Sequence, residues 1–201
     1  MTPETPFALL FDLDGTMLDT DHLHLAAYNT LLARHDRTIG LDYYKRCIMG
    51  FPNDAIMDGL FPAMDTAGHR AQAEEKEALF RGLLRELTPT AGLVELLAWA
   101  ERRAVPVAVV TNAPRANAMM MLDGLGLAAR FPVVVIGEEL VRGKPDPLPY
   151  LTALAALGVA AGDALAFEDS LAGVGAAPAR HGAAGRGGLT RPWRTSAASV
   201  L

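Results

Sequence analysis

Four short apolar runs alternate along this chain with stretches of helical periodicity. Most of the runs lack alternating polar residues, which is typical of parallel strands covered on both faces. Three intervening segments show apolar spacings of three and four, as amphipathic helices do. This order predicts an α/β fold built on a doubly wound parallel sheet. The expected strands are Phe7–Phe11, Val105–Val110, Val133–Ile136 and Ala164–Phe167, and the expected helices are Gly92–Arg103, Arg115–Leu125 and Leu148–Gly158.

The segment from Leu18 to Leu87 departs from this alternation. It contains helical patterns at His22–His35, Asp42–Met49 and Gln72–Leu87, and it has no convincing strand. We therefore expect a helical module at residues 18–87. It would be inserted into an α/β core made of residues 1–17 and 88–201.

Polar residues follow the apolar runs at the points where the strands should end. In an open parallel sheet the ligand binds at the carboxyl ends of the strands, so these residues are candidates for a common site. Carboxylates with open coordination positions suit Mg²⁺, and a lysine and a threonine can hold the remaining oxygens of a phosphate. The candidates are Asp12 and Asp14 after the first run, Thr111 and Asn112 after the second, Lys144 after the third and Glu168 and Asp169 after the fourth.

Two aspartates on one strand end can divide the chemistry of phosphoryl transfer. Asp12 could attack phosphorus as a carboxylate nucleophile and form an aspartyl phosphate. Asp14 could then protonate the leaving alkoxide and later activate water. Gly15 allows the sharp turn that follows.

The motifs DLDGT, TN, GKPDP and FEDS, in this order and spacing, resemble the signatures of haloacid-dehalogenase-like phosphohydrolases, and the resemblance covers Phe7 to Val174. It implies that Asp12 is the nucleophile and Asp14 the acid/base. It also implies a helical cap that closes over small substrates. The implied Mg²⁺ ligands are Asp12, the backbone carbonyl of Asp14, Glu168 and Asp169, and the implied phosphate contacts are Thr111, Asn112 and Lys144.

Longer stretches, such as VVTNAPRANAMMML and GFPNDAIMDGLFP, are similar to bacterial and plant sugar-phosphate phosphatases. The β-phosphoglucomutases are close relatives of these enzymes. His24 matches a cap-coupling histidine of the mutases, whereas Asn53 stands where they carry an arginine that grips the distal phosphate. This departure favours a phosphatase. A mutase remains the alternative, with Lys76 or Arg81 supplying the missing cation.

Each candidate also has a purely structural interpretation. Thr111 and Asn112 could cap a helix that begins after Pro114. Lys144 could be a surface lysine, and His24 could be a structural histidine at the start of a helix.

Composition limits the partners that this chain can have. The 201 residues carry a formal net charge of −5 and no block of like charges, which gives no reason to expect nucleic acid or a membrane surface. Cys47 is the one cysteine, and Met1–Pro6 lacks the features of a signal peptide. We expect a cytoplasmic monomer that acts on a small phosphorylated metabolite.

The last part of the sequence does not follow the family pattern. Pro178 interrupts the expected helix, and no Val or Ile occurs between Gly175 and Ser199. Residues 175–201 therefore predict no good final strand, which would leave Ala164–Phe167 at a sheet edge. We interpret this tail as frameshifted from about Gly175 or as a divergent, flexible end. A frameshift would make an inactive product the third functional alternative.

Overall fold

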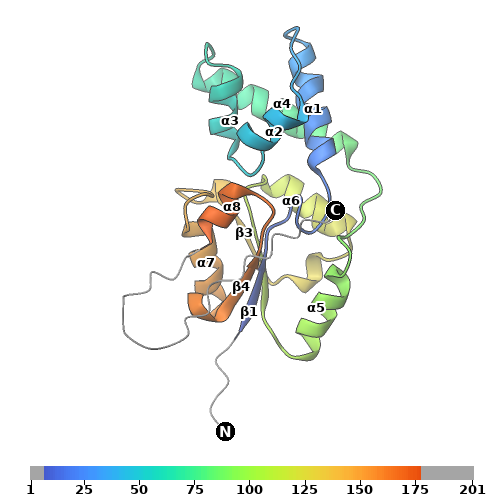
Figure 1. The fold of residues 1–201 in the computed structure, drawn as a ribbon, viewed down its shortest axis with the longest axis vertical. Coiled ribbons are helices and arrows are strands. Elements are labelled where there is room, and N and C mark those ends of the chain that lie inside the picture. Colours follow the sequence, from blue (N-terminus) through green and yellow to red (C-terminus); the bar gives the residue numbers. More distant parts are fainter. Residues whose placement is uncertain (1–6, 178–201) are drawn as a thin grey trace.

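The computed structural model describes residues 7–177 and contains one parallel sheet beneath a group of helices (Figure 1). The order in the sheet is β3-β2-β1-β4, and all three neighbouring pairs are parallel. The predicted α/β parallel sheet is therefore confirmed. The strands are β1 (Ala8–Phe11), β2 (Val107–Thr111), β3 (Val133–Ile136) and β4 (Ala164–Phe167).

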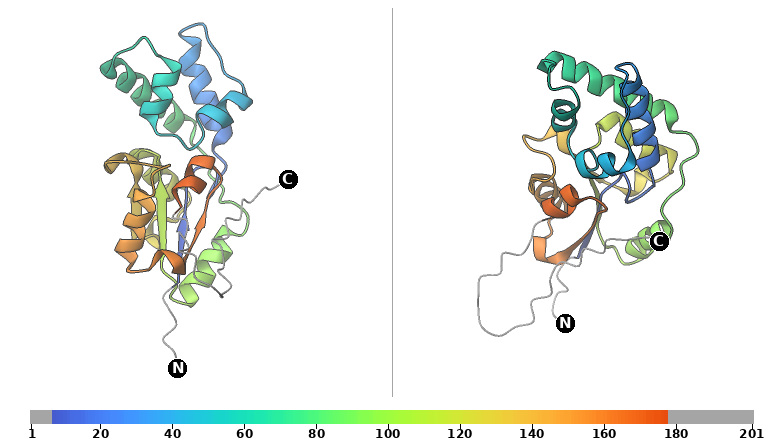
Figure 2. Two further views of the ribbon diagram at one scale, coloured as in Figure 1. Left: turned by 60° about the vertical axis from the view of Figure 1, so that its left-hand side comes forward. Right: turned by 45° about the horizontal axis from the view of Figure 1, so that its top comes forward.

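Helices cover both faces of the sheet, and four more lie beyond the carboxyl ends of its strands (Figures 1 and 2). The helices beside the sheet are α5 (Leu93–Arg102), α6 (Arg115–Gly124), α7 (Leu148–Leu157) and α8 (Leu171–Ala176). The other four, which we call the cap helices, are α1 (Asp21–Ala33), α2 (Leu41–Cys47), α3 (Asn53–Leu60) and α4 (Thr66–Leu83). Three 3-10 helices are η1 (Ala128–Arg130), η2 (Gly137–Glu139) and η3 (Ala161–Asp163).

The central strand β1 shows why the apolar runs lack polar alternation. Leu9 and Phe11 pack into a cluster that also contains buried residues of α5 and α6. Ala8 and Leu10 point to the opposite face and pack with residues of α7. All four side chains are buried because both faces of the strand are covered.

The cap helices have an apolar cluster of their own, which includes Tyr28 of α1, Tyr44 of α2 and Met57 of α3. Helix α4 also reaches the core, because its Phe80 and the C-cap residue Leu84 belong to the cluster beside α5 and α6. The division into a cap at 18–87 and a core at 1–17 and 88–201 remains our proposal.

The two chain connections between the cap helices and the sheet run beside each other. The backbone N–H of Thr90 donates to the carbonyl of Met17 at 2.8 Å, and its hydroxyl donates to the carbonyl of Thr16 at 2.9 Å. These bonds fix the cap helices next to the DLDGT turn.

The structure differs locally from the sequence expectations, most clearly at α3 and at the start of β2. Helix α3 was not predicted; it has only eight residues, and burial of Ile56, Met57 and Leu60 in the cap cluster accounts for its stability. Strand β2 begins at Val107 rather than Val105. Ala104, three residues earlier, has a φ of 51°, which interrupts an extended chain, and Pro106 has no N–H to donate.

Within residues 7–177, β4 lies at an edge of the sheet, beside β1. Residues 178–201 lie outside the described residues, so the interpretation of the tail stays a prediction. No helix between residues 7 and 177 has the length and apolar character needed to cross a membrane.

Candidate active site

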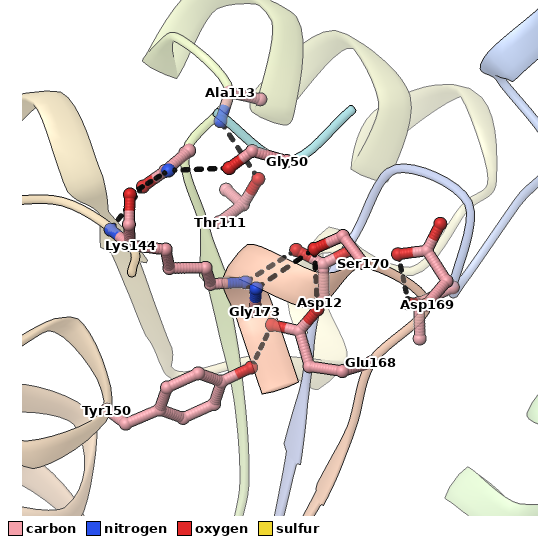
Figure 3. Close-up of polar contacts among 12 residues, drawn as sticks. Asp12, Gly50, Thr111, Ala113, Lys144, Tyr150, Glu168, Asp169, Ser170 and Gly173 are labelled. Carbon is pink, nitrogen blue, oxygen red and sulfur yellow. Dashed lines mark hydrogen bonds and ion pairs between the residues drawn. The ribbon is translucent and has the colours of Figure 1, made fainter. Parts of the chain in front are cut away.

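The ends of β1, β2 and β4 and the loop after β3 bring the candidate residues to one place (Figure 3). Strand β1 is followed along the chain by β2 and β3 on one side, while β4 lies on its other side. A parallel sheet binds ligands where its strand order reverses in this way. Asp12 and Glu168 follow the two strands that meet at this point, and the N–H of Asp12 donates to the carbonyl of Phe167 at 3.0 Å.

Lys144 is buried between these two carboxylates and is only 2% exposed. Its Nζ donates to Oδ1 of Asp12 at 2.6 Å and to Oε1 of Glu168 at 2.5 Å. Burial opposes the charge on Lys144, but the two carboxylates outweigh it and raise the pKa of the lysine. The surface interpretation of Lys144 is therefore wrong.

Burial also acts on Asp12. Desolvation raises the pKa of Asp12 well above its ordinary value, the ammonium of Lys144 opposes this, and the nearby Glu168 and Asp169 add to it. Three carboxylates, those of Asp12, Glu168 and Asp169, therefore lie near one ammonium group. A further cation beside Asp12 would favour the ionised form of its carboxylate.

The sequence did not suggest a role for Tyr150 or Gly173. The hydroxyl of Tyr150, a buried residue on α7, donates to Oε1 of Glu168 (Figure 3). A Cβ at Gly173 would lie 1.8 Å from Oε2 of Glu168, so only glycine leaves room for this carboxylate at the start of α8. Ser170 caps this helix by accepting from the N–H of Gly173.

Asp12, Glu168 and Asp169 form a group that could hold a metal ion. One oxygen from each carboxylate lies within 4.8 Å of the other two, and Asp169 is exposed. Desolvation, followed by the charges of Glu168 and Asp21, raises the pKa of Asp169 to about 7. Three converging carboxylates fit a hard divalent cation such as Mg²⁺. A Cβ at Gly15 would lie 2.0 Å from Oδ2 of Asp169, so this turn needs glycine, which has a φ of 77° here.

The side chain of Asp14 is bonded to cap-side residues instead of joining this metal group. Its Oδ1 accepts from the hydroxyl of Thr20 at 2.8 Å and lies 2.9 Å from Nε2 of His24. Desolvation would raise the pKa of Asp14, but the bonds and charge of His24, the bond from Thr20 and the charge of Lys76 hold it below its ordinary value. His24 stacks on Phe80, with ring centroids 3.8 Å apart, so its position is fixed by α4.

Thr111 and Asn112 contact the loop residues beside Lys144. The hydroxyl of Thr111 accepts from the N–H of Ala113 at 3.0 Å. The amide of Asn112 donates to the carbonyls of Lys144 and Gly50 and accepts from the N–H of Lys144. Asn112 therefore positions Lys144 in this structure. Helix α6 has Pro114 at its N-cap and no side-chain cap, so the capping interpretation of both residues is wrong.

On the cap side, Asn53 and Lys76 both contact Glu77, which was not among the site residues expected from the sequence. Nδ2 of Asn53 and Nζ of Lys76 each donate to Oε1 of Glu77 at 3.0 Å. Nζ of Lys76 also lies 3.0 Å from Nδ1 of His24. Arg81 donates instead to Oδ1 of Asn117 on α6, at 2.8 Å.

A cavity of about 80 Å³ separates these cap residues from the strand ends. Its lining includes every residue predicted for the site except Glu168, which lies buried beneath Lys144. The predicted lining residues are Asp12, Asp14, His24, Asn53, Thr111, Asn112, Lys144 and Asp169.

Several known proteins are similar to this chain. The phosphorylated carbohydrates phosphatase of Thermotoga maritima is 33% identical over 175 residues, covering 85% of this chain and 79% of that protein. The β-phosphoglucomutase of Bacillus subtilis is 29% identical over 178 residues, covering 84% and 77%. The crystal structure of CbbY from Rhodobacter sphaeroides in complex with xylulose-1,5-bisphosphate has a TM-score of 0.77 and 26% identity, covering 86% of this chain and 82% of that one.

The match to a protein family covers most of the sequence. Residues 9–181 match the haloacid dehalogenase-like hydrolases, and this range contains all the strands of the sheet except the first residue of β1. The chain therefore belongs to the haloacid dehalogenase-like hydrolase family.

Proposed function

We propose that this hydrolase is a Mg²⁺-dependent phosphatase that removes phosphate from small sugar or polyol phosphates. Its family and its similarity to a carbohydrate phosphatase support a phosphoric monoester hydrolase. The observation that carries the proposal is the meeting of Asp12, Lys144, Glu168 and Asp169 at the strand-order reversal. Nucleophile, cation and metal ligands are then all within reach of one phosphate.

Asp12 would act as the nucleophile through the oxygen that Lys144 does not hold. Lys144 bonds Oδ1, so Oδ2 is the atom to attack phosphorus, forming a phosphorus–oxygen bond to Asp12 as the ester oxygen leaves. Water then attacks the same phosphorus and releases Asp12 and inorganic phosphate. Bound Mg²⁺, held by Asp12, Asp169 and the carbonyl of Asp14 with Glu168 beside them, would offset the negative charge shared by site and substrate.

Asp14 would move the protons of both steps. It gives a proton to the leaving alkoxide and takes one from the attacking water. The contacts of Asp14 hold it ionised, which suits the second step. For the first step it must take up a proton, and His24, 2.9 Å away, is its closest titratable neighbour.

The cap helices would have to move for a sugar phosphate to bind. The cavity between the cap helices and the strand ends measures about 80 Å³. Pockets that hold drug-sized ligands measure about 300–1,000 Å³. We therefore propose that the structure represents a closed arrangement, with Gly50 of the cap against Asn112.

A β-phosphoglucomutase-like activity is the second candidate, because a mutase is among the relatives. Such an enzyme needs a cap cation for a second phosphate. Asn53 is uncharged, Lys76 is paired with Glu77, and Arg81 is bonded to Asn117. These contacts favour the phosphatase.

A panel of phosphate esters with the full-length chain tests this proposal. Phosphate release and sugar isomerisation should be measured from the same hexose phosphate, in Mg²⁺ and in EDTA. We expect Mg²⁺-dependent phosphate release. Isomerised sugar without phosphate would support the mutase instead. No turnover of any ester, including p-nitrophenyl phosphate, would favour the inactive product proposed from the tail.

A further inference from the structure

Glu77 lies at the centre of a hydrogen-bonded group on the cap side of the cavity. Its Oε1 accepts from Lys76 and Asn53, each at 3.0 Å, and its Oε2 accepts from Nδ2 of Asn117 at 2.6 Å. The residue is 6% exposed, yet it lines the cavity. The three donors fix this carboxylate in place, and Lys76 connects it through His24 to Asp14.

The charges on this cap-side wall are unfavourable for an anion. The carboxylates of Asp21 and Glu77 line the wall. Among the lining residues on the four cap helices, Lys76 is the only lysine or arginine. That lysine is 3% exposed and already bonded to Glu77. A second phosphate bound here would meet a buried carboxylate and an ammonium group that is already neutralised.

Given the phosphatase function proposed above, on which this step rests, we infer that Glu77 determines selectivity by making the cap side reject a second phosphate. The same wall can accept a neutral, hydroxylated substrate end, because Glu77 and Asn53 offer hydrogen-bonding groups to hydroxyls. The substrate class is thereby narrowed to monophosphates with an uncharged distal end. CbbY, crystallised with a bisphosphate, shows that a fold of this kind can hold two phosphates, so the discrimination depends on the residues of the wall.

A structural role of Glu77 predicts a different result. The bond to Asn117 links α4 to α6, and losing it would weaken the binding of every ligand to a similar degree. Selectivity requires the ratio between a monophosphate and a bisphosphate to change. The ratio is therefore the quantity to measure.

The experiment compares fructose 1-phosphate with fructose 1,6-bisphosphate, which differ by one phosphate group. Binding is measured by calorimetry in Mg²⁺ with the full-length chain carrying Asp12→Asn, so that neither sugar is consumed. We expect the parent to prefer the monophosphate. Adding Glu77→Gln should change the ratio of the two dissociation constants by at least about tenfold in favour of the bisphosphate. This corresponds to a change of ~1.4 kcal/mol in relative binding free energy.

Matched variants separate the charge of Glu77 from other effects. Glu74→Gln removes the same charge from an exposed position on α4 and should leave the ratio unchanged. Asn53→Lys places a cation beside Glu77 by a second route and should also favour the bisphosphate. Adding Lys76→Met to Glu77→Gln should cancel the gain, because Lys76 is the cation that Glu77 releases.

The inference would be overturned if Glu77→Gln changed the dissociation constants of both sugars equally. It would also be overturned if their ratio stayed unchanged in both the Glu77→Gln and Asn53→Lys chains, or if neither sugar bound. Phosphate release by the wild-type chain is measured separately. Selective binding without any hydrolysis contradicts the proposed function, whereas hydrolysis without the Glu77 effect contradicts only this inference.

Discussion

Replacing Lys144 by methionine tests whether the buried ion pairs organise the site. The substitution keeps much of the side-chain volume but leaves Asp12 and Glu168 buried without their shared cation. Removing one partner from a buried pair costs about 3–5 kcal/mol, because the remaining charge is uncompensated. We expect a loss of this size in the free energy of unfolding at pH 7 in EDTA.

The loss should depend on pH in a definite direction. The pKa of Asp12 already lies above its ordinary value, and it should rise further without the ammonium group of Lys144. The folded variant then binds protons that the unfolded chain releases above pH ~4. Stability falls with rising pH when the folded state holds more protons. The difference between wild type and Lys144→Met should therefore be smallest near pH 4 and grow toward pH 8.

Urea unfolding followed by circular dichroism measures both effects. With a slope of ~2 kcal/mol/M, the expected loss moves the midpoint by about 1.5–2.5 M. Lys45→Met is the matched control, since Lys45 is exposed on α2 and should change stability by less than ~0.5 kcal/mol. Equal losses for Lys144→Met and Lys45→Met, or a Lys144→Met loss that is independent of pH, would refute the account of this buried cluster.

Three further predictions concern the chemistry of the site. Asp12→Asn should abolish turnover of p-nitrophenyl phosphate. Asp14→Asn should still release a burst of p-nitrophenol, because that leaving group needs no proton. Equal turnover by Asp12→Asn and wild type would contradict these roles. The pKa of Asp169 is raised to about 7, and Mg²⁺ binds the ionised carboxylate, so the apparent Mg²⁺ affinity should increase from pH 6 to pH 8. Calorimetry in two buffers measures the protons released on binding. A pH-independent affinity would contradict the role of Asp169 as a ligand. Gly173→Ala should displace Glu168 and destabilise the fold by about 1–3 kcal/mol, as overpacking does, while Gly82→Ala, where a Cβ meets nothing within 4 Å, should be tolerated in the same thermal unfolding assay.

Local sequence was sufficient to predict the sheet and the edge at which the candidate site residues gather. Strands β3 and β4 have the bounds that their apolar runs predict. The central strand β1 shows the reason most clearly, because its four residues are buried on both faces. The residues after these runs meet because carboxyl ends of parallel strands share one edge of the sheet. Helix α3 was missed because packing within the cap stabilises it, and packing leaves little trace in eight residues.

Contacts between distant residues were decided only by the tertiary structure. A lysine before a proline gives no sign that it will be buried between carboxylates 132 and 24 residues away in sequence. Tyr150 and Glu77 likewise belong to no motif, and they matter because folding places them beside Glu168 and Lys76. Burial and charge pairing set the ionisation of each group, and both arise only when the strands, α7 and the cap helices come together. The order of apolar runs and polar residues along the chain is thus enough to tell which chemical groups reach the edge of the sheet, whereas their pairing, burial and charge depend on the folded arrangement.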